Sequence, residues 1–340
     1  MKLGRRELCL GLGGLAVLSG CGACQGAPQA QAPVPGGDAP STLSYTVHGS
    51  GASTVVEARW AAAVDPSGKV DPIRVALMLE GALEKLTGSA SPFKTWAHAT
   101  QRIGIKVNAI TSQAYTHPEL AAALARGLVQ AGSDPARVTV WDRDNEALRA
   151  RGHTIDRTGQ TVGFRCMGSD AASSAAKPQA VVAGGARVHL APLLVESDQL
   201  INIAALKDHS MAGVTLSLKN NLGMIHGAEL LHGDYFRGSG CEPGISDLAA
   251  LPEIRGRLRL VVLDALVGVC QGGPGPAESE HVWRHAGLLV SLDPVALDRR
   301  GLAIIEARRV KLGLEPLGAR AKPNPSPTFH IDHAADKLKT

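Results

Sequence analysis

The chain has 340 residues, of which 44% are hydrophobic and 19% charged, so it has enough apolar surface to bury a core and is not wholly disordered. Aromatic residues make up only 3%, and Lys and Arg exceed Asp and Glu by four, with no basic stripe along the sequence. This composition argues against a nucleic-acid partner.

Residues 1–20 have the order of regions that is typical of an export signal. Lys2, Arg5 and Arg6 precede an apolar run over residues 8–18, which is too short to cross a membrane as a helix. The arginine pair resembles a twin-arginine signal. Departures from the usual pattern around that pair leave both routes open, Sec and twin-arginine.

A lipid anchor is expected immediately after this signal. The stretch 18–21 reads Leu-Ser-Gly-Cys and resembles a bacterial lipobox, in which Cys21 is acylated and becomes the mature N-terminus. Gly22 follows the cysteine, which in a diderm bacterium favours the outer membrane, facing the periplasm. Residues 21–42, rich in Gly, Ala, Pro and Gln, predict a flexible tether.

The body of the protein, residues 43–335, alternates expected strands with expected helices. We expect strands over 54–62, 102–107, 137–141, 199–206, 258–266 and 286–291, and helices over 71–86, 116–131 and 293–312. This alternation predicts an α/β fold, with a mainly parallel open sheet and helices on both faces. Residues 151–185 form a Gly-rich insertion with no assigned place in the sheet.

Polar residues stand where the expected strands end. Asn108 follows the strand over 102–107, and Asp142 follows the strand over 137–141. Ligands of open α/β sheets bind at the carboxyl edge of the parallel strands. We therefore expect a binding site at this edge.

Residues 197–227 hold a second group of polar side chains inside strongly apolar sequence. A buried polar group needs a partner, and convergence on one ligand would satisfy several of them together. Thr215, Ser217 and Lys219 alternate with apolar residues, so an extended conformation would give this piece one apolar and one polar face. The alternative is an ordinary half-exposed strand with a solvated lysine. The polar residues in question are Asn202, Lys207, His209, Thr215, Lys219 and Asn220.

These motifs resemble the domain of unknown function 362 family over about residues 100–315. The matching motifs are Lys106-x-Asn108, Thr116-x-Pro118, Ser197-Asp198 with Ile201-Asn202, Lys207-x-His209, Thr215-x-Ser217-x-Lys219-Asn220 and Asp293-Pro294-Val295-Ala296-x-Asp298. Val107 replaces the usual proline, and the ferredoxin segment of many relatives is missing. The resemblance implies a fold and a site, but its name assigns no reaction.

The residue types at this site suit a small anionic ligand, a carboxylate or a phosphate. Lys106, Lys207 and Lys219 supply ammonium groups, and His209 exchanges a proton near pH 7. Lys219 is the expected central group, because flanking leucines would desolvate it and lower its pKa, with His209 as its proton-transfer partner.

The remaining members of the expected site orient the ligand or the lysines. Asn108, Asn202 and Asn220 add amide contacts, Thr215 adds a hydroxyl, and Asp264 would orient a lysine or a bound metal. Two function classes fit: an envelope enzyme acting on a small anionic substrate, and a lipoprotein that binds a ligand or metal, or serves in an assembly, without turnover. The sequence assigns no cofactor and no oligomeric state.

Two other sets of residues carry weaker signals. His209, His226, His232, Cys241 and Asp264 could compete as metal ligands, but their spacing matches no established motif, so no metal site is predicted. Three cysteines lie in the body, Cys166, Cys241 and Cys270, so at most one disulfide closes within it, and the sequence leaves the pairing open.

Overall fold

The computed structural model describes residues 33–111, 113–171, 179–232, 241–317 and 329–339. The expected export signal and the lipobox cysteine Cys21 lie outside the described residues. Across the described ranges, none of the helices combines the length and the apolar character that a membrane span requires.

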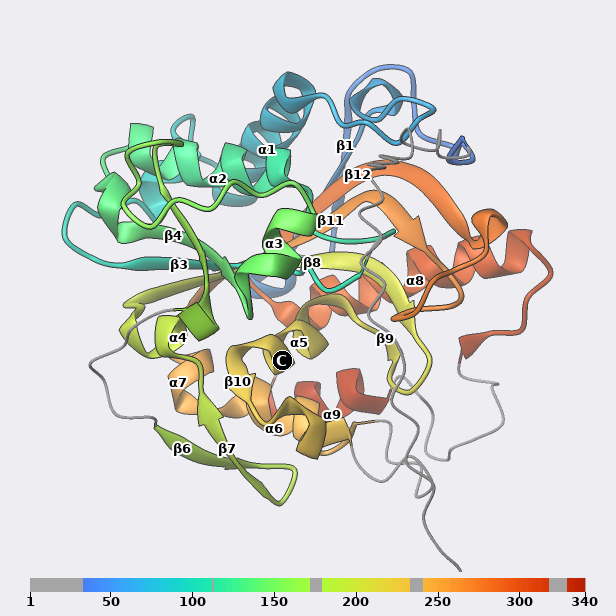
Figure 1. Cartoon of the computed structure of the whole chain (residues 1–340). Helices are drawn as coiled ribbons and strands as arrows, with labels where there is room; N and C mark the ends of the chain where they lie inside the picture. The colour runs from blue at the N-terminus through green and yellow to red at the C-terminus, as the bar shows by residue number, and fades with distance from the viewer. Residues whose placement is uncertain (1–32, 112, 172–178, 233–240, 318–328, 340) are drawn as a thin grey trace, which may run out of the picture. The chain divides into compact units, whose positions relative to one another are not determined.

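A large mixed sheet forms the centre of the body (Figure 1). Its order is β1 (Ser44–His48), β2 (Val55–Arg59), β12 (Val282–Ser291), β11 (Leu258–Val269), β8 (Gln199–His209), β3 (Ile103–Lys106), β4 (Val138–Asp142) and β5 (Arg165–Gly168), with β9 (Gly213–Val214) paired to β8. The five neighbours β11, β8, β3, β4 and β5 run parallel. Strand β12 runs antiparallel between β11 and β2, and β1 is antiparallel to β2. The prediction of a mainly parallel α/β fold is confirmed, with an antiparallel part on one side.

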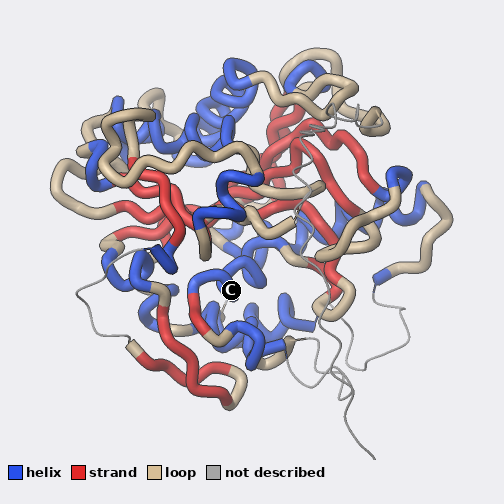
Figure 2. The backbone as a smooth tube through the Cα atoms, viewed as in Figure 1, coloured by secondary structure: helices blue, strands red, loops and turns tan. Residues whose placement is uncertain are grey.

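Helices cover both faces of the sheet, as predicted, and Figure 2 shows the strands between two groups of helices. Helices α1 (Pro72–Thr87) and α2 (Pro118–Gln130) lie on one face; α5 (Leu216–Asn220), α6 (Gly244–Ala250), α7 (Pro252–Arg255), α8 (Pro294–Lys311) and α9 (Phe329–Leu338) lie on the other. Successive side chains of a strand point to opposite faces of the sheet, which gives the protein one hydrophobic core on each face. Ile201 and Ile203 of β8 pack on the α1–α2 side, whereas Leu200 and Ala204 pack on the opposite side.

Aspartates begin the two long helices that the sequence predicted most sharply. Asp71 accepts hydrogen bonds from the backbone N–H groups at the start of α1, and Asp293 does the same for α8, each with a proline at the first helical position. Asp293 also accepts a 2.8 Å hydrogen bond from Ser53. Asp293 is therefore explained as a helix cap.

The Gly-rich insertion supplies one strand to the main sheet and starts a small second sheet. Strand β5 joins the edge of the main sheet beside β4, and β10 (Ile225–His226), β7 (Ala186–Leu190) and β6 (Ala180–Ala183) form an antiparallel sheet of their own. Two short helices, α3 (Asn145–Ala150) and α4 (Pro192–Glu196), complete the regular elements in this part of the chain. Short 3-10 helices lie at Gly51–Ser53, Ala61–Ala63, Pro92–Thr95, Pro135–Arg137, Ser169–Ala171, Asn221–Met224, Ala228–His232 and Ser279–His281.

The start of the body differs from the boundary expected at residue 43. The N–H of Val34 donates to the carbonyl of Pro66 (2.9 Å), and the N–H of Arg284 donates to the carbonyl of Pro35 (2.9 Å). Gly36 forms a parallel bridge with Arg284. These backbone hydrogen bonds hold residues 34–36 on the body, so the tether ends earlier than composition indicates.

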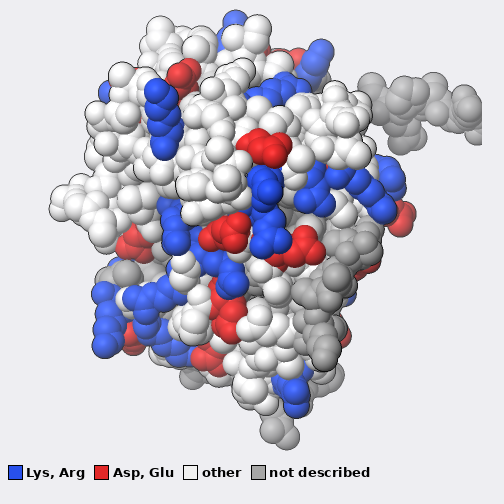
Figure 3. Space-filling model, turned by 90° about the vertical axis from the view of Figure 1, so that its left-hand side faces the viewer, with Lys and Arg blue, Asp and Glu red and all other residues white. Residues whose placement is uncertain are grey.

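On the face shown in Figure 3, basic and acidic side chains are interspersed among uncharged ones. Cys166, Cys241 and Cys270 are buried free thiols, so none of these three closes a disulfide with another.

Candidate functional site

The carboxyl ends of β3, β4 and β8 bring together side chains that are far apart in the sequence. Lys106 is the last residue of β3 and Asp142 the last residue of β4, in adjacent parallel strands. Lys207 lies near the end of β8, the other neighbour of β3. Asn108 follows β3 and reaches Lys207. We call these four residues, with Asn202 and Asn220, the strand-end cluster.

Lys106 forms a buried ion pair with Asp142. Its Nζ lies 2.7 Å from Oδ1 of Asp142, and the two side chains are 1% and 9% exposed. The other carboxylate oxygen of Asp142 accepts from the N–H of Ala109 (2.6 Å). A Cβ on Gly223 would lie 2.7 Å from the Lys106 Nζ, so a side chain at this position would have to displace the ammonium group.

Among the described residues, the hydrogen-bond partners of Lys207 are all neutral oxygens. Its Nζ donates to Oδ1 of Asn108 (2.7 Å), Oγ1 of Thr111 (2.9 Å) and the carbonyl of Ala114 (3.1 Å). The residue is 2% exposed. Burial lowers the pKa of Lys207 from 10.5 to about 7, and the positive charges of Lys219 and Lys106 act in the same direction as burial. The carboxylates of Asp142 and Asp208 oppose this shift in the pKa of Lys207.

A chain of asparagine amides links the strands to α5. Asn108 donates to Oδ1 of Asn220 (3.0 Å), and Asn220 donates to Oδ1 of Asn202 (2.7 Å). Asn202, in β8, donates in turn to Oδ1 of Asn221 (3.1 Å). Because each amide both donates and accepts, the order of these contacts fixes the orientation of every group in the chain.

Residues 216–220 form the short helix α5, so the alternation of Thr215, Ser217 and Lys219 does not produce the polar face that an extended conformation would give. Ser217 does not share a polar face with Lys219: its backbone N–H and hydroxyl both donate to Oδ1 of Asp298 (2.8 and 2.6 Å). Asp298 also accepts from the N–H of Leu218 (2.9 Å), which fixes the start of α5 on α8. Burial raises the pKa of Asp298 to about 7 against these hydrogen bonds.

Lys219 and Thr215 lie beside the strand-end cluster. Burial lowers the pKa of Lys219, and its positive charge lowers the pKa of Lys207, which places both ammonium groups in one electrostatic neighbourhood. Among the described residues, Cys241 opposes the effect of burial on the pKa of Lys219. Thr215 donates its backbone N–H to the carbonyl of Lys207 (3.0 Å), and its buried hydroxyl has no hydrogen-bond partner among the described residues.

His209 and Asp264 contact the backbone of neighbouring segments. The Nδ1 of His209 accepts from the N–H groups of Met211 (3.1 Å) and Ala212 (3.2 Å), so this nitrogen stabilises the turn between β8 and β9. Asp264 does not orient a lysine: among the described residues its carboxylate accepts from the backbone and from Nδ1 of His117 (2.7 and 2.9 Å). Despite burial, Asp264 raises the pKa of His117.

Among the described residues, the side chains that could compete as metal ligands do not come close enough together to share an ion. There, the group of acidic, His or Cys side chains close enough to share an ion is Glu278, Glu280 and His281, away from His209 and Asp264. The side chain of His232 lies outside the described residues.

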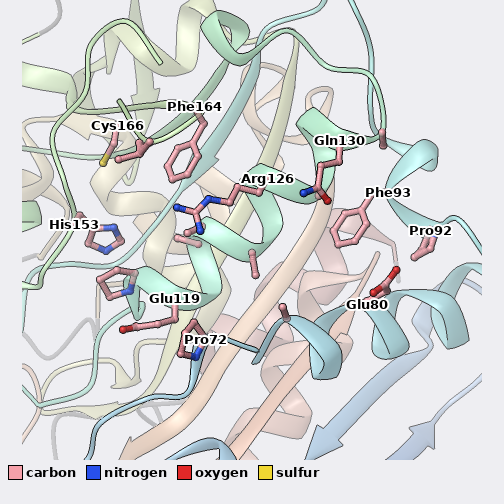
Figure 4. A pocket seen from close by; sticks show the side chains of 18 of the residues that line it. Pro72, Glu80, Pro92, Phe93, Glu119, Arg126, Gln130, His153, Phe164 and Cys166 are labelled. Carbon is pink, nitrogen blue, oxygen red and sulfur yellow. The ribbon is translucent and has the colours of Figure 1, made fainter. Parts of the chain in front are cut away.

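The larger of the two described clefts, about 630 Å³, lies on the α1–α2 face and does not include the lysines of the strand-end cluster. Figure 4 shows it over α2, with Phe93 and Phe164 on opposite sides of that helix and Arg126 extending across it. His153 lines this cleft, and its Nε2 lies 3.1 Å from the carbonyl of Thr116, behind the loop that bears Asn108.

Sequence reasoning missed several residues that complete the site. Asp142 had a usable signal, since it stands directly after a strand, but a charge partner for Lys106 could not be deduced. Thr111, Asn221 and Asp298 act through contacts that join separate segments, and single-residue patterns carry no such information.

Comparisons with known proteins assign no reaction to this chain. The family model described as Domain of unknown function (DUF362) matches residues 103–303. The lactate racemase apoprotein from Thermoanaerobacterium thermosaccharolyticum is similar in structure, with a TM-score of 0.39 and 11% identity over 68% of this chain and 55% of that chain. The chain thus spans about half the length of that structure. A search of curated proteins finds no match.

Proposed function

This chain belongs to the domain of unknown function 362 family, and we propose that it binds a small carboxylate or phosphate at the strand-end cluster. We propose further that it exchanges a proton with this ligand through Lys207. The family name assigns no reaction, so both proposals are based on the site itself. The observation that carries this proposal is the hydrogen bonding of Lys207 to three neutral oxygens at the carboxyl edge of the sheet. An ammonium group in this setting lacks the counter-charge that a bound anion would bring.

The charges around Lys207 support an anionic ligand. The positive charges of Lys106 and Lys219 lower the pKa of Lys207, and two carboxylates, Asp142 and Asp208, oppose them. Both carboxylates are already engaged: Asp142 pairs with Lys106, and Asp208 accepts from the N–H groups of Gly272 and Gly273 (3.1 and 2.8 Å). An incoming anion would therefore give Lys207 a counter-charge that neither of these engaged carboxylates provides.

The pKa of Lys207 supports proton transfer as well as binding. An amine whose pKa is about 7 is present in both forms at neutral pH, so it can take a proton from a bound acid and return it. The asparagine chain of Asn108, Asn220 and Asn202 would orient the ligand. Lys219 would contribute charge beside Lys207, so the central role moves from Lys219 to Lys207.

The proposal is tested by anion binding to the Lys207→Met variant. We expect acetate or inorganic phosphate to bind the wild type, and Lys207→Met to weaken that binding by about tenfold or more, as expected for a lost hydrogen bond to a charged group. Lys337→Met is the matched control, because Lys337 pairs with Asp247 outside the cluster. Equal binding by wild type and Lys207→Met would refute the role of Lys207.

Turnover distinguishes an enzyme from a ligand-binding lipoprotein. Native mass spectrometry with elemental analysis of protein purified from its own envelope would identify a retained ligand or metal. An enzyme should convert that ligand when it is returned to the purified protein. A binder should release it unchanged, which would contradict the proton-transfer part of the proposal.

The lipobox supports a second, independent proposal: that Cys21 anchors the protein to the outer membrane. Labelled palmitate should enter the wild type, and Cys21→Ser should lose the label and the membrane attachment. A Cys21→Ser variant that still carries the label would contradict the anchor.

A further inference from the structure

A second described cleft, of about 380 Å³, lies between α8, the β2–β12 pair and residues 36–38. It is separate from the strand-end cluster and shares none of its residues. Its lining holds four permanently basic side chains and two carboxylates; we call the four, Arg59, Arg300, Arg308 and Lys311, the basic cleft residues. The cleft is large enough for a small-molecule ligand.

The floor of this cleft is a buried carboxylate whose acceptor capacity is used within the fold. Glu57 is 3% exposed and contacts Nε2 of His285 (3.1 Å), Nε2 of His48 (3.2 Å), and Nε and Nη2 of Arg300 (3.0 and 2.7 Å). Burial opposes ionisation, but the hydrogen bonds from His285 and Arg300 outweigh it and hold the pKa of Glu57 at about 2. Glu57 therefore neutralises Arg300, and the other three basic cleft residues lie at the rim of the cleft without an ion pair to Glu57 in the described part of the chain.

At the rim, one exposed carboxylate is shared between two of these residues. Asp38 accepts from Nη2 of Arg59 (2.7 Å) at one oxygen and from Nζ of Lys311 (2.7 Å) at the other, although its side chain is 62% exposed. Lys311 and Arg59 hold the pKa of Asp38 well below its ordinary value. Asp38 thus shows where an anionic oxygen is stabilised in this cleft.

Two of the basic cleft residues have donor groups without a partner among the described residues. Arg308 pairs with no carboxylate in the described part of the chain, and its guanidinium lies 5.8 Å from the centre of the Trp283 ring. Arg59 and Arg308 each have a buried Nε without a hydrogen-bond partner among the described residues. Four basic residues against two carboxylates leave an excess of two positive charges beside one aromatic ring.

The backbone at this cleft is held in a strained form. Ala286 has a φ of +52°, which is uncommon for a residue with a side chain, and it lies in an irregularity of the β11–β12 pairing. The carbonyl of the preceding residue, His285, accepts from Arg59 (3.2 Å). Gly37 packs flat against this strand, because a Cβ there would lie 2.5 Å from the carbonyl oxygen of Arg284. Strain of this kind is concentrated at functional sites.

We propose that the basic cleft binds a phosphate group, held by Arg59, Arg308 and Lys311 beside Asp38, with the ligand's remaining part against Trp283. An excess of two charges matches the dianion of a phosphate monoester, and arginine guanidinium groups suit its oxygens. The phosphate belongs either to a soluble phosphate ester or to an anionic lipid headgroup. Both sources present non-bridging phosphate oxygens to these residues: three on a monoester and two on the diester of a phosphatidylglycerol headgroup.

Isothermal titration of the full chain with inorganic phosphate and with glycerol 3-phosphate tests the soluble source. Sedimentation with phosphatidylcholine vesicles, with and without phosphatidylglycerol, tests the lipid source. Lys311→Gln should weaken binding about tenfold, because it removes one charged donor, whereas Asp38→Asn should strengthen binding about threefold, because it removes the competing carboxylate. Lys337→Gln, which removes an ion pair with Asp247 on another helix, should leave binding unchanged.

The same titrations are repeated in a Lys207→Met background, which separates this cleft from the strand-end cluster. Binding that survives Lys207→Met and is weakened by Lys311→Gln supports the basic cleft whatever the outcome for Lys207. A response to the soluble esters alone, or to phosphatidylglycerol vesicles alone, identifies the source. Absence of binding to every probe, or binding that Lys311→Gln leaves unchanged, overturns the proposal.

Discussion

Replacement of Lys207 by methionine should stabilise the fold at neutral pH. Burial lowers the pKa of Lys207 from 10.5 to about 7, whereas the unfolded chain keeps the ordinary value. Between these two pH values the unfolded state binds more protons than the folded state, so stability rises with pH across this window. At about 1.4 kcal/mol per pKa unit, the folded protein at pH 7 is about 4 kcal/mol less stable than at alkaline pH on account of this one group.

Methionine has a similar shape and no charge, so it removes this cost. It also leaves Oδ1 of Asn108 without its ammonium donor, which costs about 1–3 kcal/mol. The hydroxyl of Thr111 keeps its 2.6 Å hydrogen bond to the carbonyl of Ala114. The balance predicts a Lys207→Met variant that is about 1–3 kcal/mol more stable than the wild type at pH 7.

Urea unfolding at a series of pH values between 7 and 10 measures both the stability and its slope. The wild type should gain stability relative to Lys207→Met as the pH rises, and Lys337→Met should follow the wild type. A Lys207→Met variant that is less stable than the wild type at pH 7, with an unchanged pH slope, would show that Lys207 is an ordinary structural ammonium group.

Three further outcomes are expected. Asp142→Asn should destabilise the fold by about 3 kcal/mol in urea unfolding, because it leaves Lys106 charged and buried without its partner. The added change Lys106→Met should recover most of that loss, and full additivity of the two changes would show that the two side chains do not interact. Asp298→Asn should lower the stability of the fold by about 1–3 kcal/mol, because it leaves the Leu218 N–H without an acceptor. The wild type should lose stability as the pH rises from about 4 to 7, because the folded carboxyl keeps its proton up to about pH 7, and Asp298→Asn should abolish this loss. An unchanged pH profile would show that Asp298 has an ordinary pKa in the folded protein. Burial raises the pKa of Cys166 to about 12, so iodoacetamide should label this thiol at neutral pH only after unfolding, and peptide mass spectrometry that finds it labelled in the native protein would contradict its burial.

Local sequence signals predicted six strands of the main sheet and the three longest helices among the described residues. Asp71 and Asp293, each followed by proline, mark helix starts because the side chain caps free N–H groups within the same few residues. The buried strands are apolar on both sides because helices cover both faces of the sheet. The antiparallel direction of β12 depends on pairing with β11 and β2, which no local pattern specifies.

The candidate site was predictable as a neighbourhood and not as a set of contacts. Lys106, Asn108 and Lys207 stand at the ends of parallel strands, and this topology alone brings them to one edge. Thr215 to Lys219 alternates polar and apolar residues as a half-buried strand would, yet residues 216–220 form the short helix α5, which the tertiary contact of Ser217 with Asp298 stabilises. Tertiary contacts of this kind override local periodicity.

The titration of the Lys207 amine tests the central claim of the account most directly. In protein labelled with 13C-lysine, the Cε resonance that disappears in Lys207→Met belongs to Lys207, and its chemical shift reports the charge of the amine. The account predicts a midpoint near pH 7 that moves to higher pH when acetate or phosphate binds, because a bound anion favours the ammonium form. A midpoint near 10.5 that no anion moves would contradict the claim that Lys207 is the proton-exchanging group of an anion site.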